Sequence, residues 1–156
     1  MNDEPIEWIW DEYVVSTQRA RLDLGTVLAL LRSTHWGQEL TEAVLKRAVT
    51  NSVCFGVYQG SALVGFGRVI TDLATYGYLT DVVIAPTHRG RGLGAWLTEC
   101  MLSHPELQGF RRTALLTRDA EALYLKAGFT PGAGSLVYME RRDVAGSSGP
   151  HQRETP

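Results

Sequence analysis

Apolar residues recur at helical spacing in two stretches near the start of the chain. In 21–32 they stand three and four positions apart, and Asp23 stands where an N-cap belongs. Thr41 stands at the N-cap position before a second stretch with helical spacing, and Asn51 ends that stretch. The buried stripe expected in this second helix consists of Val44, Leu45, Ala48 and Val49.

From residue 52 the apolar positions alternate, which is typical of strands. Two such stretches, 52–58 and 62–70, flank Gln59-Gly60 and predict a β-hairpin. The other expected elements are a short strand at 13–16 before the helices, a strand at 77–84, a helix at 93–103, a strand at 113–117, a helix at 120–127 with Asp119 as its cap, and a last strand at 135–140.

This order of elements predicts an α+β fold in one domain spanning 13–142. Short connections join the strands at 52–58, 62–70 and 77–84, so the sheet is expected to be mostly antiparallel. The strands at 77–84 and 113–117 are joined by a helix instead, and such a crossover makes two strands parallel neighbours. Residues 1–12 are acidic and are expected to form a loose lead-in. Residues 143–156 mix Gly, Ser, Pro and charge without apolar periodicity, which predicts a flexible tail.

Composition narrows the class of protein. The chain has 156 residues, 44% of them hydrophobic and 21% charged, which fits one domain with its own core. Its 15 Lys and Arg against 17 Asp and Glu give a net charge of -2, so no basic excess is available for nucleic acid. Cys54 and Cys100 lie in neither a disulfide nor a metal-binding pattern, which predicts a reducing, cytoplasmic setting without a metal site. No signal peptide or membrane span is expected, and hence no membrane partner.

The region 82–97 carries the clearest chemical signal. A β-branched run ends at Pro86, and glycines then alternate with Arg89 and Arg91 before a helical pattern starts. Free N–H groups at a helix N-terminus bind anions, and glycine lets the backbone approach a phosphate closely. The region therefore predicts a phosphate-binding loop.

Two familiar phosphate loops fit this region poorly. A P-loop contains Gly-Lys followed by Ser or Thr, and the chain has no Gly-Lys pair, which argues against hydrolysis of a nucleoside triphosphate. Gly90, Gly92 and Ala95 match a dinucleotide-binding fingerprint. However, Pro86 and its neighbours separate the strand from the loop, and the strands before it are antiparallel. Dinucleotide binding remains a distant alternative.

Two segments resemble the signature motifs of the GNAT acetyltransferase superfamily. Residues 84–94 read I-x-P-x-x-R-G-x-G-x-G, and residues 119–129 read D-x-x-A-x-Y-x-x-x-G-F. The resemblance, which covers 55–138, implies a mixed sheet with a splayed central pair of parallel strands and helices on both faces. It implies direct transfer of an acetyl group from acetyl-CoA to an amine of a small molecule or peptide, in a ternary complex and without a metal. The alternative from another class is a non-catalytic acyl-CoA-binding or sensing domain.

The same resemblance assigns residues to the coenzyme. Backbone N–H groups of the loop and two arginines would hold the diphosphate, and the preceding strand would pair with the pantetheine arm. Asp119 stands where the superfamily commonly has Asn beside that arm. The expected coenzyme residues are Val82, Val83, Ile84, Arg89, Gly90, Arg91, Gly92, Leu93, Gly94, Ala95 and Asp119.

The resemblance makes Tyr124 the expected general acid for the leaving thiolate, because a phenol is protonated at neutral pH. The amine must lose a proton, and Asp81 is the nearest carboxylate in sequence, with Asp72 and His35 as weaker candidates. Arg68, inside a strand pattern, either faces the acceptor or pairs with Asp72 or Asp81. The acceptor itself is not identified, and a homodimer through exposed sheet edges stays open. The expected acceptor-site residues are His35, Trp36, Arg68 and Tyr78.

Overall fold

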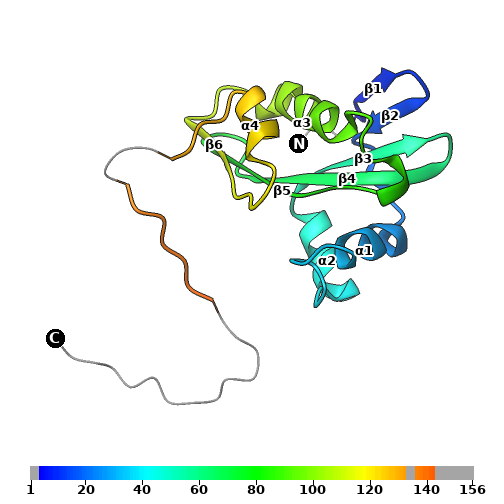
Figure 1. Cartoon of the computed structure of the whole chain (residues 1–156), viewed down its shortest axis with the longest axis horizontal. Coiled ribbons are helices and arrows are strands. Elements are labelled where there is room, and N and C mark those ends of the chain that lie inside the picture. The colour runs from blue at the N-terminus through cyan, green and yellow to red at the C-terminus, as the bar shows by residue number, and fades with distance from the viewer. Residues whose placement is uncertain (1–3, 133–135, 143–156) are drawn as a thin grey trace, which may run out of the picture.

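Within residues 4–132 and 136–142, which the computed structural model describes, the strands form one six-stranded sheet in chain order. The neighbouring strands pair antiparallel except for β5 and β6, which are parallel. Figure 1 shows this arrangement, which confirms the predicted mixed sheet with its parallel pair. The strands are β1 (Glu7–Trp10), β2 (Tyr13–Ser16), β3 (Val53–Gln59), β4 (Ala62–Thr71), β5 (Tyr76–Ile84) and β6 (Arg112–Leu115).

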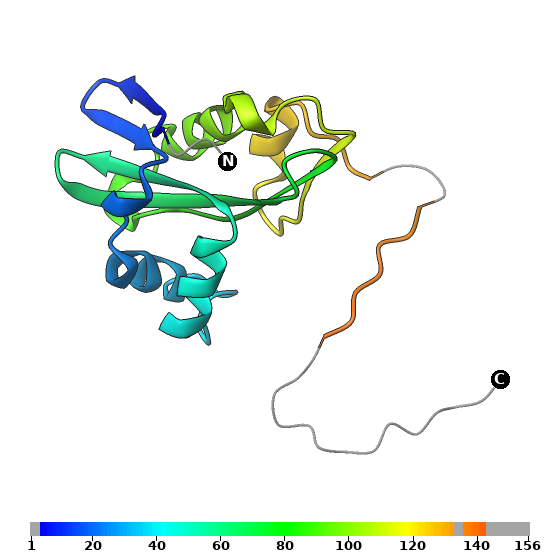
Figure 2. The same cartoon turned by 180° about the vertical axis from the view of Figure 1, so that it is seen from behind.

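Helices cover both faces of the sheet, as predicted (Figures 1 and 2). One face carries α1 (Leu24–Arg32) and α2 (Glu42–Thr50), and the other carries α3 (Leu93–Ser103) and α4 (Glu121–Lys126). No helix in the described ranges combines the length and the apolar character that crossing a membrane requires. Short 3-10 turns join some of the elements, at Arg19–Arg21, Pro86–His88 and Pro105–Leu107.

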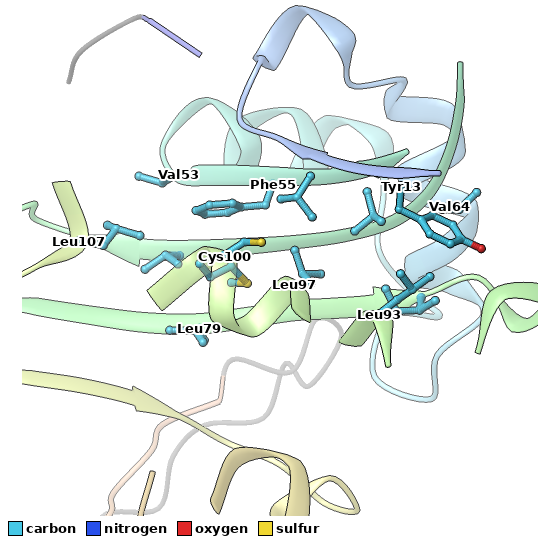
Figure 3. Close-up of a cluster of buried hydrophobic side chains, with 14 residues drawn as sticks. Tyr13, Val53, Phe55, Val64, Leu79, Leu93, Leu97, Cys100 and Leu107 are labelled. Atoms are coloured by element: carbon cyan, nitrogen blue, oxygen red, sulfur yellow. The ribbon is translucent and has the colours of Figure 1, made fainter. Parts of the chain in front are cut away.

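Each face of the sheet has its own apolar core. On the α3 face, Phe55 of β3 packs in one buried cluster with Leu97 of α3 (Figure 3). On the other face, Leu31 of α1, Leu45 of α2 and Phe66 of β4 form a second buried cluster. Burial stabilises the fold by roughly 1.5–3 kcal/mol for each large apolar side chain, so these clusters fix both helical layers to the sheet.

The two expected N-caps at the start of the helical region are confirmed. The Asp23 carboxylate accepts hydrogen bonds from the N–H groups of Gly25 and Thr26 at the start of α1. The Thr26 hydroxyl also donates to it at 3.0 Å, and this bond is the main reason that the pKa of Asp23 lies below its ordinary value. Thr41 accepts a 3.3 Å bond from the first turn of α2, and Asn51 ends that helix.

Two local expectations about helices were wrong. Val44 is 51% exposed, because Leu45 and Val49, one turn apart, supply the face of α2 that reaches the core. Asp119 does not cap α4, which begins two residues later. The N–H of Ala120 instead donates to the Thr117 hydroxyl at 3.0 Å. This bond orients the residue before the helix, and no side chain of the described residues caps α4.

Residues 1–12 were expected to form a loose lead-in, but residues 7–10 of this segment form strand β1. All four of its residues pair antiparallel with β2. Trp8 packs on Phe55 with their ring centroids 6.0 Å apart. Residues 8–10 are all apolar and show no alternation, so pairing with β2 and burial of the Trp8 indole decide the outcome. Residues 1–3 of this stretch lie outside the described residues.

The last strand expected at 135–140 is also a wrong prediction over its described part. Residues 136–140 pair with no strand of the described sheet, and they stand apart from it in Figure 1. Leu136, Val137 and Met139 are correspondingly exposed. Apolar alternation predicted the strand, but a strand also needs a hydrogen-bonding neighbour. Residue 135 and the tail expected at 143–156 lie outside the described residues.

Candidate functional site

Strands β5 and β6 separate partway along their length. Their parallel pairing runs as far as Leu79 opposite Leu115, although β5 continues to Ile84. Beyond this point the described sheet offers the outer edge of β5 no neighbouring strand. Its backbone N–H and C=O groups on that side are therefore available to a ligand.

A β-bulge marks the point of separation. The register between β4 and β5 shifts from Phe66 to Arg68, so that Gly67 stands opposite both Asp81 and Val82. Asp81 has a left-handed backbone with φ 57°, which is uncommon for a residue other than glycine. A bulge bends its strand and increases its twist, which accounts for the divergence of β5 from β6.

A cavity of about 480 Å³ lies where this gap meets the glycine loop, and we call it the loop cavity. Every residue expected to hold the coenzyme lines it except Arg91. It also has wall residues that sequence reasoning missed, among them His88, whose position inside the loop was the available signal. The expected residues that line it are Val82, Val83, Ile84, Arg89, Gly90, Gly92, Leu93, Gly94, Ala95 and Asp119.

The glycine loop presents unpaired backbone donors to this cavity. Gly90 and Gly92 have φ 75° and 81°, values that side chains other than glycine rarely adopt. Gly92 is the N-cap of α3, and the Trp96 N–H donates to its carbonyl at 3.0 Å. The N–H groups of residues 93–95 precede that bond and have no partner within the helix. Such a helix start is an anion-binding geometry.

The two loop arginines are placed differently. The Arg89 Nε donates to the Ile84 carbonyl at 3.0 Å, which holds this side chain at the wall of the loop cavity. Arg91 is half exposed and donates to the Tyr13 hydroxyl at 2.9 Å, with Glu12 at 3.9 Å. The structure therefore places Arg91 beside the N-terminal hairpin and off the wall of the cavity, because β2 offers it a partner that the sequence pattern did not reveal.

The hairpin of β1 and β2 supports the loop from outside. The buried Tyr13 hydroxyl lies 3.0 Å from Nδ1 of His88, a residue on the wall of the loop cavity. The Trp10 indole lies so close to Gly92 that a Cβ atom there would sit 3.3 Å from it. Trp10 also packs edge-on against Trp96 of α3 at 5.5 Å. The loop conformation therefore depends on residues far away in sequence.

A second cavity, of about 450 Å³, lies beside the first, and we call it the aromatic cavity because Trp36, Tyr78 and Tyr124 line it. The expected acceptor residues His35, Trp36 and Tyr78 all reach its wall. Asp81 does so as well. Sequence reasoning missed the arginines Arg118 and Arg142, which contribute positive charge there.

The two cavities meet at residues that line both, namely Val82, Asp119, Ala120 and Tyr124. Burial raises the pKa of Tyr124 above its ordinary value, so its hydroxyl keeps its proton at neutral pH. The ring packs edge-on against Phe129 of the same motif, with the ring centroids 5.9 Å apart. The expected acid therefore lies at the junction of the two cavities.

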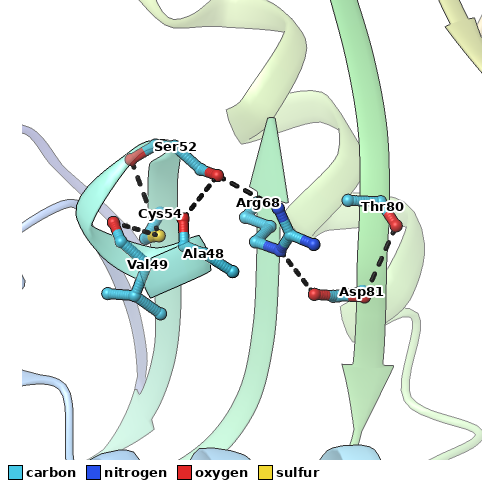
Figure 4. A network of polar contacts seen from close by, with 7 residues as sticks. All are labelled: Ala48, Val49, Ser52, Cys54, Arg68, Thr80 and Asp81. Carbon is cyan, nitrogen blue, oxygen red and sulfur yellow. Dashed lines mark hydrogen bonds and ion pairs between the residues drawn. The ribbon is translucent and has the colours of Figure 1, made fainter. Parts of the chain in front are cut away.

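Arg68 lies behind Asp81 and does not line the aromatic cavity. Its Nε donates to the Asp81 carboxylate at 2.5 Å, and both side chains are only 14% exposed (Figure 4). One nitrogen of the same guanidinium donates to the Ser52 hydroxyl at 3.0 Å. Of the partners expected for Arg68, the structure therefore selects Asp81.

The remaining candidates lie outside both cavities. Asp72 accepts hydrogen bonds from its own turn, chiefly from the Thr75 hydroxyl at 2.7 Å, and these bonds hold the pKa of its carboxyl group well below the usual range. Cys54 and Cys100 are buried, which raises the pKa of their thiols to about 11 and about 12. In the part of the chain that the structure describes, no cluster of His, Cys, Asp or Glu is arranged to hold a metal ion.

Comparison with known proteins gives one consistent class. A family model for the acetyltransferase (GNAT) domain matches residues 50–131. A candidate acetyltransferase of Gibberella zeae is 35% identical in an alignment that covers 79% of this chain and 81% of that protein. The crystal structure of a candidate GNAT acetyltransferase from Xanthomonas campestris pv. campestris has a TM-score of 0.80 at 42% identity and covers 84% of this chain and 93% of that one.

A more distant likeness concerns the fold alone. A candidate acetyltransferase of Clostridium acetobutylicum, crystallised with acetyl-CoA, has a TM-score of 0.59 at 12% identity and covers 88% of this chain and 95% of that one.

The matched region contains both the glycine loop and Tyr124. The chain therefore belongs to the GNAT acetyltransferase family, as its two motifs predicted, and it is an acyltransferase enzyme.

Proposed function

We propose that the enzyme moves an acetyl group from acetyl-CoA directly to an amine while both are bound. The observation that carries this proposal is the junction of the two cavities at Val82 and Tyr124. A thioester held in the loop cavity and an amine held in the aromatic cavity would meet there. Holding two reactants side by side makes their reaction effectively unimolecular. The match of residues 50–131 to the acetyltransferase (GNAT) domain supports this choice of donor.

The loop cavity fits the chemistry of the coenzyme. The free N–H groups at the start of α3 would hold the diphosphate, and Arg89 would add positive charge. The Ala85 N–H donates to the Val64 carbonyl of β4 at 2.8 Å. Because successive N–H groups of a strand point to opposite sides, the Ile84 N–H faces the gap. It would pair with the pantetheine arm or polarise the thioester carbonyl.

Tyr124 is the proposed general acid. As the new carbon–nitrogen bond forms and the carbon–sulfur bond breaks, its hydroxyl would give its proton to the departing sulfur. A phenol keeps its proton at neutral pH, as a proton donor must, and burial raises the pKa of Tyr124 further above that range. Positioned proton transfer contributes roughly a hundred- to ten-thousand-fold in rate.

Asp81 is the proposed acceptor of the proton that the amine loses, directly or through water. Its carboxylate lines the aromatic cavity while Arg68 balances its charge from behind.

The amine would bind among His35, Trp36 and Tyr78. Aromatic walls give apolar contact area with a polar edge, which suits a small molecule or the end of a peptide. The proposal includes no nucleic-acid partner, because the net charge of the chain is -2. Whether two copies associate stays an open part of the proposal.

Two further expectations remain part of this proposal. The single domain would extend to residue 142 but begin at Glu7, where β1 starts, rather than at Tyr13. The buried free thiols of Cys54 and Cys100 fit a reducing compartment, which is the basis for proposing a cytoplasmic enzyme.

Two measurements on the full chain test the proposal. Calorimetric titration with acetyl-CoA should show binding, and thiol release should exceed the amine-free background for at least one class in a panel of amino acids, polyamines, aminoglycosides and peptides. Binding without thiol release from any amine would favour a non-catalytic acyl-CoA-binding domain. Heat with NADH but none with acetyl-CoA would favour the dinucleotide alternative.

A further inference from the structure

Arg68 is a charged residue in the middle of β4, with only 14% of its side chain exposed. Burying a charge is unfavourable unless partners replace the lost water. Cys54 on β3, its antiparallel neighbour, belongs to the apolar cluster on the helix α1 face. Apolar packing therefore does not explain an arginine at this position of β4.

The guanidinium joins two elements of the fold (Figure 4). Its Nε donates to the Asp81 carboxylate in β5, and its Nη1 donates to the Ser52 hydroxyl at 3.0 Å. That hydroxyl donates in turn to the Ala48 carbonyl of α2 at 2.7 Å. A continuous chain of hydrogen bonds thus connects the end of α2 to the bulge in β5. Arginine suits this position because its rigid fork can serve two acceptors in different directions.

The bulge at Asp81 requires a contact that stabilises its backbone conformation. Asp81 holds a left-handed backbone at φ 57°, a conformation that costs free energy for a residue with a side chain. Its carboxylate accepts from Arg68 on one oxygen, with the Thr80 hydroxyl 3.4 Å from the other. Without Arg68, a buried carboxylate would lose its counter-charge and the backbone would lose the contact that compensates its strain.

The bulge in turn determines where the next residues of β5 lie. Val82, Val83 and Ile84 follow it directly and form one wall of the loop cavity. The direction of the Ile84 N–H, and the width of the gap toward β6, depend on how far the bulge bends the strand.

We infer that Arg68 is a positioning residue for acetyl transfer: through Ser52 and Asp81 it fixes the bulge that sets the open edge of β5 for the coenzyme. The kinetic part of this inference rests on the proposed function. The structural part does not, because the bulge can be observed in the protein without any ligand.

The direct test compares Arg68→Met, Arg68→Lys and Ser52→Ala with the parent chain at a temperature where each is folded. Neither substituted residue lines either cavity, so direct contact with a substrate does not explain an effect. We expect Arg68→Met to raise KM for acetyl-CoA and lower kcat, with a combined loss in kcat/KM of about a hundredfold, since misplacement by about 1 Å costs that much. Arg68→Lys should recover part of the loss. Ser52→Ala should lose roughly three- to tenfold, as expected for one hydrogen bond.

Amide exchange of the ligand-free protein provides the readout that does not depend on catalysis. In Arg68→Met the amides within 80–85 that pair with β4, such as that of Ala85, should exchange about tenfold faster because this pairing loosens, while those of β3 keep their parent rates. Ser103→Ala, which removes a hydroxyl that donates to a helix carbonyl elsewhere, is the matched control for Ser52→Ala. Arg21→Met is the matched control for Arg68→Met, because Arg21 pairs with Glu7 at a more exposed site.

The inference would be overturned by parent exchange rates at 80–85 in folded Arg68→Met and Ser52→Ala. Parent kinetic constants in both variants would overturn it as well. Absence of acetyl transfer by the parent would contradict only the proposed function, since the exchange result stands alone.

Discussion

The Tyr13 hydroxyl accepts a 2.9 Å hydrogen bond from the Arg91 guanidinium, although 78 positions separate the two residues. The same hydroxyl lies 3.0 Å from Nδ1 of His88, three residues before Arg91. One buried phenol of β2 therefore contacts two residues of the loop that would hold the diphosphate. The N-terminal hairpin is part of the machinery that shapes this loop.

We predict that Tyr13→Phe weakens acetyl-CoA binding by about fivefold, because each lost hydrogen bond is worth roughly 0.5–1.5 kcal/mol. Calorimetric titration measures the change. Tyr58→Phe is the matched control, because the Tyr58 hydroxyl is buried without a hydrogen-bond partner among the described residues. Its removal should leave the affinity unchanged. Equal affinity of Tyr13→Phe and the parent would show that the hairpin does not shape the loop.

We predict that Gly92→Ala weakens acetyl-CoA binding at least tenfold and destabilises the fold by about 1–2 kcal/mol. The residue has φ 81°, and an added Cβ would also press on Trp10 at 3.3 Å. Gly60→Ala makes the same change in the hairpin between β3 and β4, at φ 59° with open space around it. It should cost similar backbone strain but leave binding intact, which separates damage to the loop from general destabilisation. Comparable binding by the two variants would contradict the role of the loop.

Much of the fold follows from local sequence patterns. Asp23 and Thr41 cap their helices as predicted because an N-cap needs only its own next few residues. Gly60, at φ 59°, forms the predicted hairpin turn for the same reason. The glycine loop and Tyr124 could be found because each belongs to a short motif with fixed spacing.

The parts that sequence reasoning missed depend on distant partners. β1 is a strand only because β2 lies beside it. Arg91 lies with Tyr13 rather than at the cavity wall, and for Arg68 the contacts of β4 and β5 select Asp81 among the alternatives that the sequence left open. Tertiary contacts determine each of these pairings, and the spacing of residues along the chain does not reveal them.

His104 should make stability depend on pH. It is buried, and burial lowers the pKa of its imidazole below the ordinary 6.5, with the Glu106 N–H donating to its Nδ1 at 3.2 Å. The unfolded chain therefore binds more protons just below that value, so stability is present above about pH 6.5 and is lost as pH falls through it. Urea unfolding at several values between about pH 5 and 7 measures this slope.

The control for this pH dependence is His104→Asn, which keeps an acceptor for the Glu106 N–H but does not titrate. Its slope in this window should be smaller than that of the parent. Asp23 and Asp72 have lowered pKa values, so their contributions are lost only below their ordinary value of 3.8, outside this window. An unchanged slope in His104→Asn would show that another group is responsible.

The most direct test of the central claim is the rate of thiol release by Tyr124→Phe, with its affinity for acetyl-CoA measured on the same sample. The account predicts that the dissociation constant stays within about twofold, because the ring remains, while kcat falls about a hundredfold or more with the loss of the proton donor. It also predicts no fall in the parent rate between about pH 7 and 9, because burial raises the pKa of Tyr124 above its ordinary value of 10.0. An unchanged kcat in Tyr124→Phe would contradict the account.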